Sequence, residues 1–96
     1  AIIRTDGAGV VDPVAFLTIE YDDIIRKSLR ACLGCRTDPD GRVARAERAL
    51  TEAHARVVKT VVQAGRIRME DVDLIGFHGQ TIFHDPASRF TWQIGD

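Results

Sequence analysis

A long amphipathic helix is the feature that most constrains how this chain can fold. The apolar side chains of residues 43–64 recur at helical spacing, at Ala46, Leu50, Ala53, Val57, Val58 and Val61. Charged residues lie between them and occupy the opposite face. Because the valines near the end of this segment are mediocre helix formers, tertiary packing has to stabilise that end. An apolar face of this length needs a covering layer, and we expect a sheet to supply it.

Shorter elements are predicted on both sides of this helix. β-branched and aromatic residues favour strands at residues 1–5, 16–21, 72–77 and 90–94. The first two could pair as a hairpin, with Asp6-Gly7 as a turn signal and an irregular stretch around Pro13. A short helix is predicted to start at the N-cap Asp22 and to stop at Gly34, and Gly65 is expected to end the long one. A buried strand that follows a helix is typical of α/β architecture, which is the fold class that we expect.

Charge and length exclude several classes of protein. The 96 residues contain 13 Lys and Arg against 14 Asp and Glu, a formal net charge of -1. Binding to nucleic acid or to a membrane surface needs concentrated positive charge, so we expect neither partner. The longest stretch without a charged residue, 74–84, is shorter than the roughly 18 apolar residues of a membrane span. Both ends of the chain resemble the interior of a longer protein, and we expect the chain to be a fragment.

Two cysteines, Cys32 and Cys35, form a Cys-x-x-Cys group at the end of the predicted short helix. The plainest interpretation is a pair of reduced thiols. A redox pair normally opens a helix, whereas this group closes one. A zinc site completed by His78 and His84 would need a second short knuckle of ligands, which their spacing does not provide. A non-enzymatic α/β module with a metal or redox element at these cysteines remains the alternative to an enzyme.

Four residues directly after the predicted strand 72–77 could carry chemistry: His78, Gly79, Gln80 and Thr81. Ligands of α/β proteins collect at the carboxyl ends of strands. Gly79 lets a backbone approach closely, and the carboxamide of Gln80 can read sugar hydroxyls and acetamido groups. The imidazole of His78 can donate, accept or titrate near neutral pH. The competing interpretation is that these polar groups only bond to the backbone in a turn.

Further polar residues follow in the last part of the chain. His84 lies six residues after His78 and would share its face in a regular strand, although a simple hydrogen-bonded histidine beside a proline turn explains it equally. Gln93, Gly95 and Asp96 form another strand end, where function and turn chemistry both remain open. We expect His54 to be a half-buried residue of the long helix.

Two motifs in a fixed order point to a known family. Residues 72–86 contain His78-Gly79-Gln80-Thr81 and then a His-x-Pro at residue 84, and residues 91–96 read Thr-Trp-Gln-Ile-Gly-Asp. This pattern resembles the anhydro-N-acetylmuramic acid kinases, which carry His-Gly-Gln-Thr, His-x-Pro and Thr-x-Gln-Ile-Gly-Asp at similar spacing. The resemblance extends over essentially the whole chain.

The resemblance implies a fold, an activity and a place in the cell. The fold would be part of an actin-like, ribonuclease H-like sugar kinase with a mixed sheet and packing helices, and residues 1–96 would be part of the N-terminal domain of its two domains. The parent enzyme would use ATP and Mg²⁺ to phosphorylate 1,6-anhydro-N-acetylmuramic acid while opening its anhydro ring. It would work as a cytoplasmic homodimer in cell-wall recycling. The expected substrate-binding residues are His78, Gly79, Gln80 and Thr81, and the expected cleft or support residues are His84, Gln93, Gly95 and Asp96.

Three family segments have no counterpart in these 96 residues: the phosphate loop, the segment with the catalytic aspartate and a later Gly-Gly-Gln-Gly-Ala-Pro segment. The resemblance places the phosphate loop before Ala1 and the catalytic aspartate, which activates water in this family, after Asp96. We therefore assign no catalytic residue and no metal ligand to this chain, and Asp96 is not taken for the base. We expect ATP and Mg²⁺ to bind mainly outside these residues, and residues 1–96 alone to be inactive.

Overall fold

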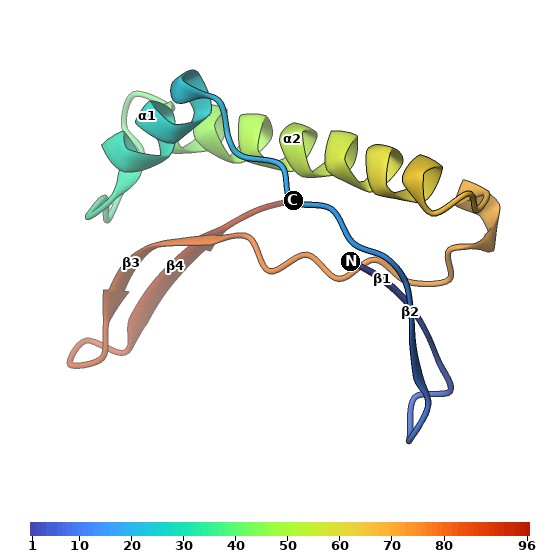
Figure 1. The fold of residues 1–96 in the computed structure, drawn as a ribbon. Helices are drawn as coiled ribbons and strands as arrows, with labels where there is room; N and C mark the ends of the chain where they lie inside the picture. The colour runs from blue at the N-terminus through green and yellow to red at the C-terminus, as the bar shows by residue number, and fades with distance from the viewer. The chain divides into compact units, whose positions relative to one another are not determined.

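The computed structural model describes all of residues 1–96 and divides them into two compact units. The first unit comprises residues 1–20 and 54–75, and the second comprises residues 21–53 and 76–96. The elements follow one another along the chain (Figure 1) as β1 (Ile2–Thr5), β2 (Val11–Ala15), α1 (Asp23–Cys32), α2 (Arg42–Ala64), the 3₁₀ helix η1 (Met69–Asp71), β3 (Gln80–Asp85) and β4 (Phe90–Ile94). No helix is both long enough and apolar enough to cross a membrane.

In the first unit, β1 and β2 form an antiparallel hairpin. The expected first strand is confirmed, but the expected second strand at residues 16–21 is wrong, because β2 lies at residues 11–15, where we expected an irregular stretch. The turn explains the difference. The Asp6 carboxylate accepts hydrogen bonds from the backbone amides of Ala8, Gly9 and Val10, which lowers the pKa of Asp6 and returns the chain early. The residues directly after this turn, 11–15, therefore pair with β1.

The expected buried strand at residues 72–77 is also wrong. This segment forms no strand, and Leu74 and Ile75 in its middle are exposed, at 87% and 55% accessible. A strand needs a neighbour to pair its backbone groups, and no strand of this chain pairs with these residues. The expected mixed sheet is likewise not formed. The chain contains two separate antiparallel sheets of two strands each.

Both predicted helices are confirmed, and local signals explain where they begin. The Asp22 side chain accepts from the Ile25 amide at 2.8 Å and caps α1. Asp38 caps α2 in the same way, by accepting from the amides of Val43 and Ala44 at 2.9 and 3.0 Å. A helix N-terminus leaves amides without intrahelical partners, and these two carboxylates supply them.

α2 ends at Ala64, directly before Gly65, as expected. The residue with the left-handed conformation is Arg66, at a φ of 53°, and the Ile67 amide donates back to the Val62 carbonyl. Gly65 serves packing instead. A Cβ there would lie 3.2 Å from the Cβ of Ala15, so the missing side chain lets the helix end approach the hairpin of the first unit.

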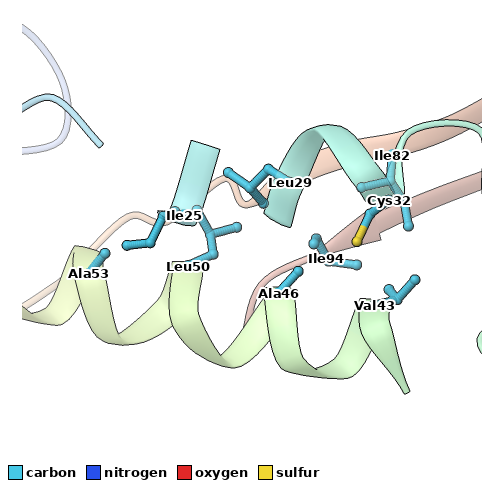
Figure 2. Packing of buried hydrophobic residues seen from close by; sticks show 9 residues of the cluster. All are labelled: Ile25, Leu29, Cys32, Val43, Ala46, Leu50, Ala53, Ile82 and Ile94. Carbon is cyan, nitrogen blue, oxygen red and sulfur yellow. The ribbon is translucent and has the colours of Figure 1, made fainter. Parts of the chain in front are cut away.

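The core of the second unit lies between the first half of α2, α1 and the β3–β4 hairpin. Figure 2 shows apolar side chains of α2 pointing toward those of α1 and of the two strands. The layer that covers α2 here is therefore a helix together with a hairpin, not the sheet alone that we expected. The buried cluster consists of Ile25, Leu29, Cys32, Val43, Ala46, Leu50, Ala53, Ile82 and Ile94.

Candidate functional site

The β3–β4 hairpin brings the two sequence motifs together at its open end. Gln80 pairs with Ile94 and Thr81 pairs with Gln93, so the start of β3 lies beside the end of β4. We call residues 78–81 and 93–96 the hairpin base. Within it, Gly79 and Gln80 are half-buried, whereas His78 and Thr81 are exposed. All the expected substrate-binding residues lie in the hairpin base, together with three of the four expected support residues.

Two glycines let the strands' ends cross closely in the hairpin base. Gly79 and Gly95 both have positive φ values, of 65° and 140°. A Cβ at Gly79 would overlap the carbonyl oxygen of Ile94. A Cβ at Gly95 would lie 2.7 Å from the ring of Phe77 and 3.0 Å from the Cα of Gly79. Only residues without a side chain fit this crossing, which explains structurally why both motifs have glycine at these positions.

One carboxamide side chain, that of Gln93, stabilises the same crossing. The Gln93 side-chain amide donates to the backbone carbonyl of His78, which joins the second motif to the first. The Gln80 side-chain amide donates to the Thr81 carbonyl at 3.2 Å. Part of the polar cluster therefore does bond to the backbone, as the competing interpretation held, and the bond of Gln93 holds the two motifs in register.

Helix α2 contributes two contacts that the sequence reasoning missed. The Glu47 carboxylate accepts from the Gly95 amide at 2.8 Å, and the Thr51 hydroxyl accepts from the Asp96 amide at 3.0 Å. Glu47 and Thr51 are four residues apart and so lie on one face of the helix. Both are half-buried beside the buried Ala46 and Leu50, a property that only the structure reveals.

An open groove of about 420 Å³ adjoins this contact between α2 and the chain end. Of the expected site residues, only Asp96 lines it. The other lining residues belong to α2 and are mostly polar or charged: Ala44, Glu47, Arg48, Thr51 and Glu52.

His84 lies toward the other end of the hairpin. It pairs with Thr91, and its Nδ1 lies 2.8 Å from the threonine hydroxyl. His78 precedes β3, so the two histidines are not on one continuous strand as the spacing had suggested. Next to His84, the side chain and backbone of Ser88 donate to the Asp85 carboxylate and lower its pKa. The Arg36 guanidinium, 2.6 Å from the same carboxylate, lowers this pKa further. His84 therefore belongs to the hydrogen-bonded turn region of the hairpin.

The two cysteines are separate reduced thiols with no reactive surroundings. Cys32 is fully buried in the core of the second unit, and this burial raises its pKa. A catalytic or redox thiol needs the opposite shift. Cys35 is half-buried and directs its sulfur to the Ala31 carbonyl at 3.9 Å. No three His, Cys, Asp or Glu side chains gather into a group that could hold a metal ion.

Comparison with known proteins finds one family. The family described as anhydro-N-acetylmuramic acid kinase matches residues 1–96. Among curated relatives, proteins named anhydro-N-acetylmuramic acid kinase from Rhizorhabdus wittichii and Bradyrhizobium diazoefficiens are 45% and 43% identical over the whole of this chain. One from Azorhizobium caulinodans is 38% identical over 99% of it. The chain spans only 27–28% of the length of these relatives.

Proposed function

Because this chain belongs to the anhydro-N-acetylmuramic acid kinase family, we propose that its parent protein phosphorylates 1,6-anhydro-N-acetylmuramic acid at the expense of ATP. The reaction would open the anhydro ring and give N-acetylmuramic acid 6-phosphate, for the recycling of cell wall in the cytoplasm. The single observation that carries this proposal is the family match over all 96 residues, which includes both motifs of the hairpin base.

We propose that residues 1–96 are part of the N-terminal domain of a two-domain, actin-like kinase that works as a homodimer. The exposed apolar residues of the first unit support a larger fold around this chain. Phe16 is 78% and Leu74 87% accessible, which is unfavourable for side chains of this size when several lie in one unit. In the parent protein, further strands would pair with residues 72–77 and complete the buried strand that their sequence favours.

The hairpin base is the proposed sugar-binding element of this chain. The imidazole of His78, the carboxamide of Gln80 and the hydroxyl of Thr81 can donate to or accept from sugar hydroxyl, acetamido and carboxylate groups. Gly79 would let the sugar approach the backbone. Gln93, Gly95 and Asp96 would act as support, as Gln93 does through its bond to the His78 carbonyl. His84 would support the same element from the turn region of the hairpin.

ATP and Mg²⁺ would bind mainly to parts of the parent protein outside this chain. Phosphoryl transfer depends on positioning and on electrostatic stabilisation of the phosphates. The family resemblance assigns the phosphate loop and the catalytic aspartate to segments outside residues 1–96. We therefore expect residues 1–96 alone to leave the anhydro sugar unphosphorylated. Incubating the purified chain with ATP, Mg²⁺ and the sugar and following ADP release tests this. ATP-dependent formation of the 6-phosphate by the 96 residues would contradict it.

Replacing Gln80 by alanine in the full-length parent is expected to lower kcat/KM for the anhydro sugar by roughly 5- to 150-fold. This is the effect of about 1–3 kcal/mol for leaving a buried polar partner unsatisfied. Steady-state kinetics at saturating ATP measure it. Gln63→Ala is the matched control, because Gln63 is an exposed glutamine of α2 outside both motifs. An unchanged kcat/KM in Gln80→Ala would count against the proposed site.

A further inference from the structure

We propose that Glu47 and Thr51 of α2 are positioning residues for the sugar-binding element, acting through the backbone of Gly95 and Asp96. This inference rests on the proposed function, because it takes the hairpin base as the place where the sugar binds. Neither residue belongs to the two recognised motifs. Both act on the second motif from a helix that lies more than 40 positions earlier in the sequence.

The hydrogen bonds of this contact join two side chains of α2 to two backbone amides. The Thr51 hydroxyl donates its proton to the Glu47 carbonyl at 3.0 Å and accepts from the Asp96 amide at 3.0 Å. The Glu47 carboxylate accepts from the Gly95 amide at 2.8 Å, and an ionised acceptor makes a stronger bond than a neutral one. Two consecutive amides are therefore held by two side chains one helical turn apart.

The helix that carries these side chains is itself fixed by the core. Ala46 and Leu50 flank Glu47 and Thr51 in sequence and are 1% and 0% accessible. Figure 2 shows both of them pointing into the cluster formed with α1 and the hairpin. A site residue held from a packed helix keeps a narrower geometry than one held from a loop. Glu47 and Thr51 thus hold residues 95 and 96 in a fixed position relative to the core of the second unit.

Gly95 packs directly against Gly79 of the first motif, so the position of one constrains the position of the other. A carbon added at Gly95 would lie 3.0 Å from the Cα of Gly79, so the two backbones are in close contact. The Gln93 side chain, from β4, also donates to the His78 carbonyl. A shift of residues 95 and 96 away from α2 would therefore move Gly79 and, with it, the flanking His78 and Gln80. We infer that losing the α2 contacts weakens sugar binding although no sugar-contacting side chain has changed.

The experiment compares three threonine variants in the full-length parent. Thr51→Val keeps the shape of the side chain and removes its hydroxyl, Thr51→Ser restores the hydroxyl, and Thr60→Val is the matched control. Thr60 makes the same bond back to its own helix, to the Arg56 carbonyl at 2.9 Å. It is exposed, and the bond to Arg56 is local to α2.

We expect Thr51→Val to raise KM for the anhydro sugar by about 2- to 13-fold, as the loss of one hydrogen bond does. KM for ATP should change less than KM for the sugar. In Thr51→Val, hydrogen exchange of the Asp96 amide should accelerate, whereas Thr51→Ser should return both readouts to near the wild-type values. Thr60→Val should leave both unchanged. Glu47→Ala should accelerate exchange at Gly95, and Glu47→Gln, which keeps an acceptor oxygen, should not.

Two results would overturn the inference. The first is unchanged exchange at Asp96 in Thr51→Val, since the amide is then not held by this hydroxyl. The second is accelerated exchange without any change in KM for the sugar, since the position of residues 95 and 96 then does not matter for binding. A wild-type parent that does not phosphorylate the anhydro sugar would instead overturn the proposed function, and the exchange rates would still report on the α2 contact, so the two failures are distinguishable.

Discussion

Replacing Gly79 by alanine is expected to lower the free energy of unfolding by about 2–5 kcal/mol, the sum of a left-handed backbone for a residue with a Cβ and of local overpacking. Gly79 has a φ of 65°, and its new methyl group would overlap the Ile94 carbonyl oxygen. Since a backbone carbonyl in a strand pairing cannot rotate away, the hairpin base would have to open. Urea unfolding of the chain, followed by the fluorescence of its single tryptophan, measures the change.

Trp92 is a suitable reporter because it lies in β4 and packs half-buried against the core of the second unit, to which Gly79 also belongs. The matched control is Gly76→Ala. Gly76 precedes the motif by two residues, has no positive φ and would place its added carbon in open space. Equal unfolding midpoints for the two variants would show that the glycine crossing does not constrain this hairpin.

Replacing Leu50 by alanine is expected to cost about 2–5 kcal/mol, as for other fully buried leucines. Leu50 is 0% accessible and lies in the middle of the cluster that joins α2, α1 and the hairpin (Figure 2). The same tryptophan fluorescence follows the loss. Leu33→Ala is the control, since Leu33 is 58% exposed and its truncation should cost less than about 1 kcal/mol. A Leu50→Ala variant as stable as Leu33→Ala would contradict the core described here.

The helices could be predicted from the sequence because their determinants are local. Asp22 caps α1 by accepting from the amide of Ile25, only three residues later. The apolar spacing of α2 likewise repeats within a few turns. The strands depend on partners elsewhere in the chain. The segment 72–77 has the composition of a buried strand, but no strand in these 96 residues pairs with it, so composition alone predicted the wrong state.

The same distinction holds for the candidate site. The residues of the two motifs could be selected from their chemistry, and a short hairpin brings them together. Glu47 and Thr51 could not be selected from the sequence, because their partners Gly95 and Asp96 lie 48 and 45 positions away. In addition, polar residues on a helix usually face water. For Gly79 the sequence predicted a close backbone approach, but not that the neighbouring group would be the Ile94 carbonyl.

The continuity of α2 has a thermodynamic consequence. This one helix gives its first half to the second unit and its last turns to the first unit. Helix formation is cooperative, because each added turn relies on the turn before it. Once the first half of α2 has folded in the second unit, its last turns add by propagation and need no new nucleus, so folding of the second unit favours the helical part of the first.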